Sequence, residues 1–432
     1  MNVVFLLLFV AVLLGFVIAD ISIVYALLIG YGIFFVYAIK KGFSVLAILK
    51  MSASGILSAK NVLINFLLIG MLTGLWRASG TIPSIVSYSV KIMHPSFMIV
   101  LTFLLCCLVS FLTGTAFGTS ATMGVICMSI AAAMGVEPML IGGAVVSGAY
   151  FGDRCSPVST SALLVSELTK TDLYDNIKNM IKTAAVPFLV TCLIYMALGL
   201  IPSVGGVAFD AVGVFESEFH LGWIPLIPAI IILGLSLARL NVKITMLTSI
   251  VAAFIICIFY QKESVGDILK FSIMGYEAKN FAAAEMINGG GIVSMLRVGA
   301  IVCISSSYSG IFHKTDILEA VERLINKLHS KISTFSVVLT TALASSAIAC
   351  NQTLAIMLTQ QLCNGIESDK KRLAGFLENS AVVVSSLIPW SIACRVPLDS
   401  VGAPTYSLVF AALNILIPLW SLWIWRRKKD KS

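Results

Sequence analysis

Residues 147–161 read SGAYFGDRCSPVSTS, and they interrupt an apolar segment that runs from residue 138 to residue 168. A proline breaks a helix because it removes a backbone N–H donor. If this segment crosses a membrane, the backbone groups freed at Pro157 lie at membrane depth, where they can coordinate a cation or face an anion. Asp153 and Arg154 come just before the break, and charges inside a membrane are costly and line transport pathways. The stretch therefore predicts a transport site, and the alternative is a structural ion pair near a helix end.

The composition of the whole chain indicates a membrane protein. Of its 432 residues, 59% are hydrophobic and only 12% are charged, whereas soluble domains carry about 25% charged residues. This excludes a soluble enzyme, a disordered chain and a nucleic-acid-binding domain. The apolar runs are continuous and about twice as long as the ~10-residue alternating strands of a membrane barrel. We therefore expect an all-α polytopic protein in a lipid bilayer, with no nucleic-acid partner.

The apolar segments form two series that match in order and length. The first comprises 3–19, 21–39, 61–79, 95–134, 138–168 and 183–202, and the second comprises 221–238, 244–260, 290–312, 332–365, 374–398 and 404–425. Such a match predicts an internal repeat. The repeats are residues 1–205 and 221–432, and a polar, acidic linker at 206–220 joins them.

The two longest blocks, 95–134 and 332–365, have small and hydroxyl residues in the middle. These stretches read TGTAFGTSAT at 113–122 and SSAIACNQT at 345–353. Such residues are typical of places where the backbone bends inside a protein-lined cavity. Each block can hold two full spans or one re-entrant hairpin, and we interpret both as hairpins. Each repeat then has five spans, one re-entrant hairpin and one broken helix.

The basic residues predict the orientation. With hairpins at both blocks and the N-terminus in the cytoplasm, most of the 29 Lys and Arg residues fall in cytoplasmic segments, as the positive-inside rule requires. Because five spans is an odd number, the second repeat is inverted relative to the first. Both termini are then cytoplasmic, the linker is extracellular, and the protein lies in the plasma membrane. Two amphipathic segments, 171–182 and 314–331, are expected along the cytoplasmic face.

The second repeat has its own break, where Glu378-Asn379-Ser380 precedes the stretch Ser385-Ser386-Leu387-Ile388-Pro389-Trp390-Ser391. Again a carboxylate comes before small polar residues and a proline within an apolar segment. Two broken helices and two hairpin tips related by inversion would meet near the membrane midplane, which is the architecture of a secondary transporter site. The chain has no nucleotide-binding motif, so an ion or solute gradient must drive transport.

The candidate residues for substrate and ion binding come from the two breaks and the two hairpin tips. They are Thr115, Gly118, Thr119, Ser120, Asp153, Arg154, Ser156, Pro157, Ser159, Thr160, Asn351, Gln352, Thr353, Glu378, Asn379, Ser380, Ser386, Pro389, Trp390 and Ser391. We expect Asp153 and Glu378 to carry protons. The ten cysteines include no CxxC pair and the four histidines are far apart, so no metal site and no cofactor are expected.

The chain resembles the NhaC-type sodium/proton antiporter family of the ion transporter superfamily. The likeness begins at residues 70–83, GMLTGLWRASGTIP, and continues through GTAFGT at 114–119 and GAYFGDRCSP at 148–157. It ends with LENS at 377–380 and LIPW at 387–390. The resemblance implies an electrochemical antiporter, with relatives that exchange sodium for protons or malate for lactate. It also points to a homodimer.

The sequence departs from the family pattern near the expected site. Where the family reads Ser-Asp-Thr-Thr-Asn, this chain reads STSAL at 159–163. The family's Glu-Asp-Ser-Gly is ENSA at 378–381, and its Pro-Trp-Asn is PWS at 389–391. Carboxylates and amides are good ligands for hard cations, and most of these changes remove one. The resemblance therefore predicts the fold better than the transported solute.

Three functions follow from these residues. The first is a secondary antiporter that exchanges sodium or another small solute for protons. The second keeps the fold and transports small organic anions or amino acids, by proton coupling or exchange, with Arg154 and Arg395 facing the solute. The third is a channel or an intramembrane enzyme. We do not expect an enzyme, because no Ser/His or paired-Asp arrangement lies within the apolar segments.

Overall fold

A computed structural model gives the fold of the chain. It describes every residue except Met1, Asp20, Met93, Val158, 202–210, Arg239, 280–283, 285–286, 313–331, Asn364 and 430–432. The amphipathic segment predicted at 314–331 therefore lies outside the described residues. The described residues form helices and loops, and their one strand-like pairing is an antiparallel bridge between Tyr276 and Gly289.

Most helices of the first half are long and apolar. They are α1 (Asn2–Ile18), α2 (Ile23–Lys40), α3 (Val45–Ser58), α4 (Lys60–Ala78), α5 (Thr81–Ile92), η1 (Pro95–Phe97), α6 (Met98–Thr113), α7 (Ala116–Thr119), η2 (Ser120–Gly124), α8 (Val125–Ala133), α9 (Pro138–Cys155), α10 (Thr160–Thr169) and α11 (Leu173–Leu200). Gly114 separates α6 from α7 in the left-handed conformation, with φ of +66°. The first predicted hairpin tip is therefore a true break in the helix.

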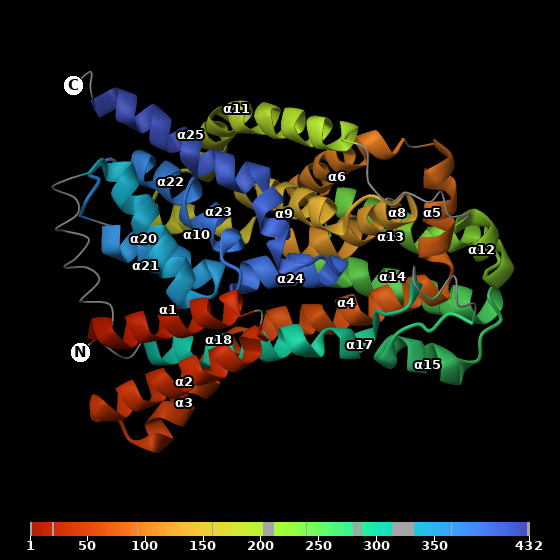
Figure 1. The fold of residues 1–432 in the computed structure, drawn as a ribbon, viewed down its shortest axis with the longest axis horizontal. Helices are drawn as coiled ribbons and strands as arrows, with labels where there is room; N and C mark the ends of the chain where they lie inside the picture. Colours follow the sequence, from red (N-terminus) through yellow and green to blue (C-terminus); the bar gives the residue numbers. More distant parts are fainter. Residues whose placement is uncertain are drawn as a thin grey trace.

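The second half begins in the linker. Its helices are α12 (Ala211–Glu218), η3 (Ile224–Leu226), α13 (Ile227–Leu237), α14 (Val242–Phe259), α15 (Val265–Met274), α17 (Gly291–Ser294), α18 (Leu296–Phe312), α20 (Thr334–Ala349), α21 (Gln352–Cys363), α22 (Lys370–Glu378), α23 (Ala381–Val384), η5 (Ser385–Leu387), α24 (Ile392–Val401), η6 (Thr405–Phe410) and α25 (Ala412–Lys429). Both chain ends lie at the same end of the molecule's long axis (Figure 1).

The structure is that of an all-helical, polytopic membrane protein. Among the described residues, three helical stretches are long and apolar enough to cross a membrane, namely Pro95–Thr113, Ala116–Ala133 and Leu173–Leu200. Two bent helix pairs would raise this number to five, and several shorter apolar helices accompany them. The predicted count of ten spans, the two re-entrant hairpins and the inversion remain predictions.

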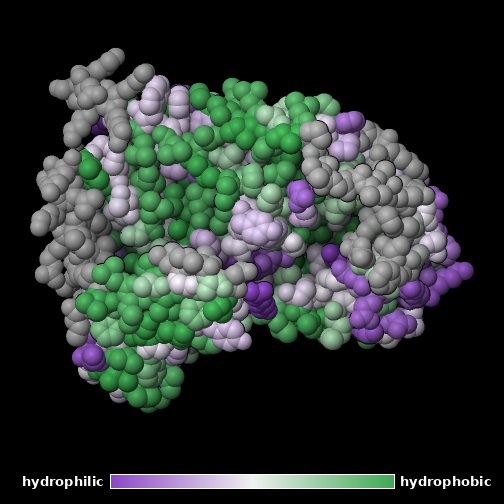
Figure 2. All heavy atoms as spheres, in the orientation of Figure 1, coloured by the Kyte–Doolittle hydropathy of each residue, from purple (hydrophilic) through white to green (hydrophobic). Residues whose placement is uncertain are grey.

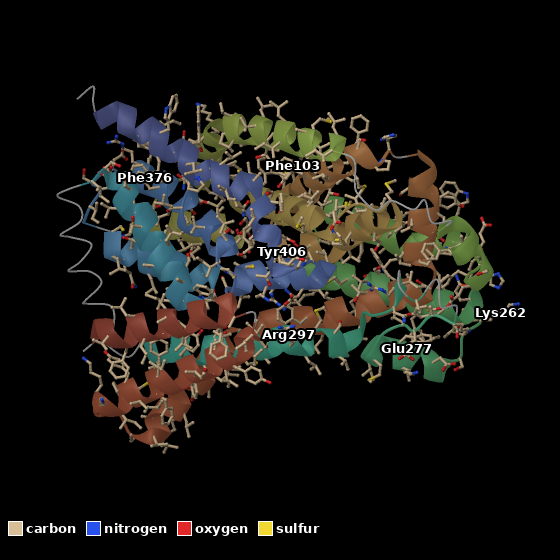
Figure 3. The ribbon with its side chains drawn as sticks, viewed as in Figure 1. Phe103, Lys262, Glu277, Arg297, Phe376 and Tyr406 are labelled. Carbon is tan, nitrogen blue, oxygen red and sulfur yellow. The ribbon has the colours of Figure 1, made fainter. Side chains whose placement is uncertain are left out.

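Hydrophobic side chains cover much of the face drawn in Figure 2, and hydrophilic ones gather at the end near α15. Lys262 and Glu277 lie at this end (Figure 3). Glu277 pairs with Lys270 at 3.1 Å, and both side chains are exposed. Charged side chains that reach water are expected outside the apolar core of a bilayer.

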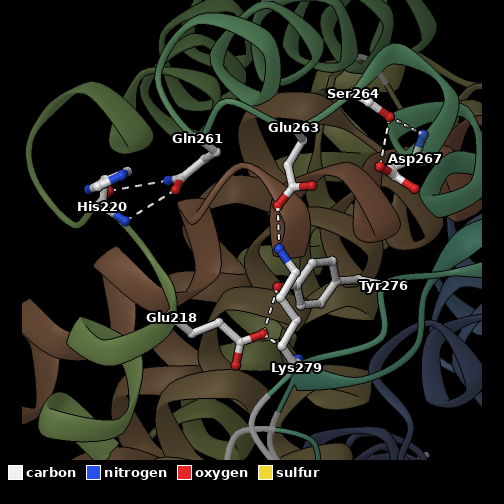
Figure 4. Close-up of polar contacts among 8 residues, drawn as sticks. All are labelled: Glu218, His220, Gln261, Glu263, Ser264, Asp267, Tyr276 and Lys279. Atoms are coloured by element: carbon white, nitrogen blue, oxygen red, sulfur yellow. Dashed lines mark hydrogen bonds and ion pairs between the residues drawn. The ribbon is translucent and has the colours of Figure 1, made fainter.

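The predicted linker is partly helical and is tied to the second half. Glu218, at the end of α12, accepts hydrogen bonds from the Tyr276 hydroxyl at 2.9 Å and the Lys279 backbone N–H at 2.7 Å (Figure 4). The Lys279 ammonium pairs with Glu263 at 3.2 Å. Burial and the neighbouring Glu218 carboxylate raise the pKa of Tyr276, so its hydroxyl remains a donor at neutral pH.

Two glycines of the 70–83 motif make a close helix-to-loop contact. A Cβ added to Gly74 would lie 2.4 Å from the Phe271 carbonyl oxygen, and one added to Gly70 would lie 2.7 Å from the Gly291 oxygen. Gly290 and Gly291 have φ values of +75° and +76°, which L side chains rarely adopt. The i, i+4 glycine pair on α4 thus lets the glycine loop of the second half pack directly on the helix backbone.

Helix α9, which carries Asp153, packs on α6 in the same way. A Cβ on Gly148 would lie 2.5 Å from Cys106 Cβ, and a Cβ on Gly152 would lie 2.1 Å from the Phe111 backbone nitrogen. Small residues let helix backbones approach closely in membrane proteins. This contact fixes the position of the end of α9, where the predicted site begins.

Two predicted segments differ from the structure. The amphipathic segment 171–182 was expected as a separate helix along the membrane face, but it forms the first turns of α11 and continues without interruption to Leu200. No residue near 182 stops a helix, because the proline of α11 comes later, at Pro187. The predicted span 61–79 is followed by a second helix, α5, and the pair is bent by 66°.

Candidate functional site

The helix break predicted around Pro157 is confirmed. Helix α9 ends at Cys155 and α10 begins at Thr160, where the Ser159 hydroxyl accepts hydrogen bonds from the backbone N–H groups of Ser161 and Ala162. The Asp153 carbonyl is one of the groups left without a helical partner at the end of α9. It accepts hydrogen bonds from the hydroxyls of Ser159 and Ser161. Two serines of the second helix thus replace the bonds that the proline prevents.

The Asp153 carboxylate joins the two halves of the chain. Its Oδ2 accepts a hydrogen bond from Ser161 Oγ at 2.9 Å and another from Gln352 Nε2 at 2.9 Å. Gln352 Nε2 also donates to the Val382 carbonyl at 3.0 Å. Only 5% of the residue is exposed, so the carboxylate is buried between the two halves.

Asp153 borders a cavity of about 470 Å³, hereafter the Asp153 cavity. Its described lining is Asn65, Leu112, Thr113, Gly114, Thr115, Ala116, Phe117, Asp153, Thr160, Leu240, Asn241, Lys243, Asn351, Gln352, Thr353, Ile392 and Ala393. The tips of both predicted hairpins therefore meet at the end of the first broken helix. Six predicted site residues come together here: Thr115, Asp153, Thr160, Asn351, Gln352 and Thr353.

Four polar lining residues were missed by the sequence reasoning, namely Thr113, which lies next to the first hairpin tip, and Asn65, Asn241 and Lys243. Asn65 is an amide within the apolar segment 61–79, and this isolated amide is a signal that could have found it. Asn241 is the N-cap of α14, and Lys243 lies in the first turn of that helix. Nothing in their local sequence predicts that the start of α14 reaches the hairpin tips, because that contact depends on tertiary packing.

Arg154 points away from Asp153 and forms no ion pair with it. Its guanidinium donates to the Glu378 carbonyl at 3.1 Å, to the Met180 carbonyl at 3.4 Å and to the Thr183 hydroxyl at 3.1 Å. It also donates to Asn379 Oδ1. The side chain is fully buried. Arg154 therefore connects α9, α11 and the end of α22, and it does not line the Asp153 cavity.

Glu378 is a second buried carboxylate, but it lies outside the Asp153 cavity. The residue is fully buried, and neither carboxylate oxygen has a hydrogen-bond partner among the residues the structure describes. Its main chain is held by the bond from Arg154. A buried carboxylate without hydrogen bonds is costly. The environment of Glu378 therefore differs from that of Asp153, whose carboxylate accepts two hydrogen bonds.

Most other predicted residues bond to nearby backbone. Thr119 and Ser120 donate to Thr115 and Ala116 carbonyls at 2.8 Å each, and Thr115 Oγ1 accepts from the Gly118 N–H at 3.3 Å. These bonds stabilise the helix that follows the first tip. None of the hydroxyls of Thr119 and Ser120 lines the Asp153 cavity, so the structure assigns them a local role.

The second break is held by similar contacts. Trp390 Nε1 donates to the Ala347 carbonyl at 2.8 Å, and the Ile392 N–H donates to the Cys350 carbonyl at 2.8 Å. Ser391 caps α24 by accepting from the Ala393 N–H at 3.2 Å. Ser386 accepts a hydrogen bond from the Asn414 side chain, and Ser380 donates to the Phe376 carbonyl. Ser156 follows the last residue of α9. Pro157 and Pro389 lie in the two breaks.

The break in the second half also contacts the first half. Tyr150 of α9 donates its hydroxyl to the Ala393 carbonyl at the start of α24, at 2.7 Å. Both residues are buried. The ends of the two broken helices are thus in direct contact beside the Asp153 cavity, which is the arrangement expected of a transporter site built from discontinuous helices.

Comparison with known proteins identifies the family. The Na+/H+ antiporter family matches residues 1–167 and 148–397. The chain belongs to this family. Among its relatives, an uncharacterized Na+/H+ antiporter of Haemophilus influenzae is 27% identical over 85% of this chain and 82% of its own length. The Na+/H+ antiporter NhaC of Alkalihalophilus pseudofirmus is 26% identical over 82% of this chain and 79% of its own.

The name of a further relative refers to organic acids. The malate-2H+/Na+-lactate antiporter of Bacillus subtilis is 26% identical over 95% of this chain and 91% of its own length. These likenesses confirm the resemblance expected from the motifs. The antiporter is a secondary transporter and a multi-pass membrane protein. The family name alone does not determine which solute its site binds.

Proposed function

We propose that this antiporter exchanges sodium or another small solute for protons at the Asp153 cavity. The observation that carries the proposal is that a buried carboxylate, which accepts hydrogen bonds from both halves of the chain, borders a polar cavity built from both halves. A carboxylate in such a place can bind either a proton or a hard cation. Competition between the two for one carboxylate couples their movements.

Neighbouring oxygens can complete a cation site. Thr115 and Thr160 supply hydroxyls, and Asn351 and Gln352 supply amide oxygens, on the lining of the same cavity. Oxygen ligands of this kind suit sodium, and a single carboxylate matches its single charge. Glu378 is the second proposed proton carrier, because its carboxylate is fully buried and a proton would remove the cost of its unsatisfied charge.

Alternating access would use the second break as a gate. The Asp153 cavity includes Asn241 and Lys243 at the start of α14, where the nearby basic residues predict the cytoplasmic side. Ile392 and Ala393 line this cavity, whereas Leu387 and Pro389, on the other side of the break, line a separate cavity. That second cavity includes Ile21 and Ser22, whose connection is predicted to be extracellular. We further propose the plasma membrane, cytoplasmic termini and a homodimer.

Exchange of small organic anions or amino acids is the second candidate function. Two observations favour it. A relative that is similar over almost the whole chain is named for malate and lactate, and two arginines line the second cavity. Arg154, which was expected to face the solute in this case, is buried among backbone groups instead.

The test is dissipation of an imposed pH gradient in proteoliposomes that contain the purified full chain. Sodium, lithium, potassium, lactate and malate are added in turn. We expect sodium-dependent dissipation that is lost in Asp153→Asn and in Glu378→Gln, and retained in Glu277→Gln, which alters an exposed carboxylate. Dissipation that is independent of every added solute, or full activity of Asp153→Asn, would overturn the proposal.

A further inference from the structure

A second cavity, of about 550 Å³, lies between α18, α24 and η6. Its described lining is Ile21, Ser22, Arg297, Leu387, Pro389, Arg395, Thr405, Tyr406, Leu408, Val409 and Ile415. We call it the arginine cavity. Arg297 and Tyr406 are labelled near the centre of the molecule in Figure 3, and Figure 2 shows hydrophilic side chains at the centre of the same face, between hydrophobic surfaces.

Arg395 is held in a fixed position with one donor unused. Its Nη2 pairs with Asp399 Oδ1 at 2.8 Å, and its Nη1 donates to the Thr405 hydroxyl. The third nitrogen, Nε, is buried and has no hydrogen-bond partner within the described residues, and only 8% of Arg395 is exposed. A buried donor of a charged group without an acceptor is destabilising, so a ligand with an acceptor atom would relieve this cost.

The charges of the arginine cavity do not balance. Its described lining contains two arginines and no carboxylate. Asp399 pairs with Arg395 and also interacts electrostatically with Arg297 of α18, which forms no direct ion pair with any described residue. The immediate surroundings therefore carry an excess of one positive charge next to apolar side chains. Inside or near a membrane such a charge is costly, and one anionic group would neutralise it.

We propose that the arginine cavity binds the carboxylate of a small monocarboxylic acid. The planar guanidinium groups of Arg297 and Arg395 are suited to carboxylate oxygens, because they present several N–H donors in fixed directions. The Tyr406 hydroxyl borders the same space and offers a further donor. A single carboxylate matches the single excess charge.

The apolar part of the lining favours an acid with a short hydrocarbon body. Leu387, Leu408, Val409 and Ile415 supply aliphatic surface next to the two guanidinium groups. A second carboxylate on the ligand would meet this surface without a counter-charge, so dicarboxylates should bind more weakly. This site is distinct from the Asp153 cavity and does not depend on proton exchange there.

The experiment is isothermal titration calorimetry with the purified full chain in a neutral detergent. The probes are sodium lactate and sodium propionate, and sodium succinate and sodium chloride serve as the dicarboxylate and salt controls. We expect lactate and propionate to bind, and Arg297→Gln to weaken their binding by about tenfold or more. Arg297→Lys should retain part of the affinity, because it keeps the charge and loses the planar group.

Arg395→Gln should also weaken binding, but it leaves Asp399 without its partner, so Arg297→Gln is the decisive variant. The control Arg372→Gln changes an arginine that pairs with Glu367 and lies over the Trp425 ring, outside the cavity, and should bind as the parent does. Asp153→Asn should abolish exchange and retain carboxylate binding. Loss of binding in Asp153→Asn would instead place the acid at the Asp153 cavity.

The anionic group could also belong to a lipid, because Tyr406 and Val409 are 64% and 73% exposed. A second titration therefore uses nanodiscs with and without phosphatidylglycerol. Under the proposal, lactate binds in nanodiscs made of neutral lipid alone. Absence of binding by any monocarboxylate, together with stabilisation by phosphatidylglycerol that Arg297→Gln removes, would identify a headgroup site and overturn the proposal.

Discussion

Gln352 donates its side-chain amide to Asp153 Oδ2 at 2.9 Å and to the Val382 carbonyl at 3.0 Å. One amide group therefore connects the first residue of α21, after the second hairpin tip, with both broken helices. Asp153 belongs to the first half of the chain, and Gln352 and Val382 belong to the second. Any movement that separates α9 from α21 must break the hydrogen bond between Gln352 and Asp153.

Gln352→Ala is expected to slow exchange and to lower thermal stability. The variant removes one of the two hydrogen bonds to the Asp153 carboxylate and leaves the Val382 carbonyl without its donor, at a cost of about 1–3 kcal/mol. Both effects can be measured, by pH-gradient dissipation in proteoliposomes and by the midpoint of thermal unfolding in detergent. Gln361→Ala, on the exposed side of the same helix, is the control. Equal exchange rates in the two variants would contradict a role for the amide.

Arg154→Gln is expected to destabilise the protein strongly. The parent guanidinium donates to Glu378, Asn379, Met180 and Thr183 from a fully buried position. A shorter neutral amide cannot reach these acceptors together, and removal of one member of a buried charged network costs about 3–5 kcal/mol. The yield of monodisperse protein and its unfolding midpoint should both fall.

The substitution Arg154→Lys tests geometry separately from charge. A lysine keeps the positive charge but has a single nitrogen, which cannot reach the acceptors on α11 and at the end of α22 together. It should rescue only a small part of the lost stability. The control Arg372→Gln lies at a half-exposed site and should unfold close to the parent. A lysine variant as stable as the parent would show that charge alone is required.

The sequence predicts the breaks in this fold better than the directions of its side chains. Pro157 and Pro389 mark real interruptions because a proline cannot donate to a helix wherever it lies. Asp153 and Arg154 were expected to act together. They are adjacent on α9, and successive residues of a helix point about 100° apart. One consequently faces the cavity and the other faces α11 and α22.

The composition of the cavity lining depends on packing that no local pattern encodes. Gln352 and Thr115 could be predicted because polar residues at a hairpin tip need partners inside a membrane. The contributions of Asn241 and Lys243 could not be predicted, because only tertiary packing brings the start of α14 to the site. Glu378 matches Asp153 in sequence pattern, yet it lies outside the cavity. The match between the two halves of the sequence therefore predicts the positions of the buried carboxylates. It does not predict which of them lines a cavity.

Gly152→Ala is expected to disturb the site through helix packing. The added Cβ would lie 2.1 Å from the Phe111 backbone nitrogen, so α9 must move away from α6 and carry Asp153 with it. We expect lower stability and slower exchange, by the same assays. Gly375→Ala is the matched control, because nothing lies within 4 Å of its Cβ position. Alanine favours the helix there by about 0.5–1 kcal/mol, so the control should be unchanged or slightly more stable.

Thr160→Asp is expected to strengthen sodium binding. The family pattern that was compared with residues 159–163 has an aspartate at this position. Thr160 lines the same cavity as Asp153. A second carboxylate close to the ion adds an attraction larger than the ~1.4 kcal/mol that corresponds to a tenfold change in affinity. The sodium concentration for half-maximal exchange should fall by about tenfold or more. Thr160→Asn has the same shape as the aspartate variant without its charge, so it should remain close to the parent. If the two variants respond to sodium in the same way, the cation does not bind at the Asp153 cavity.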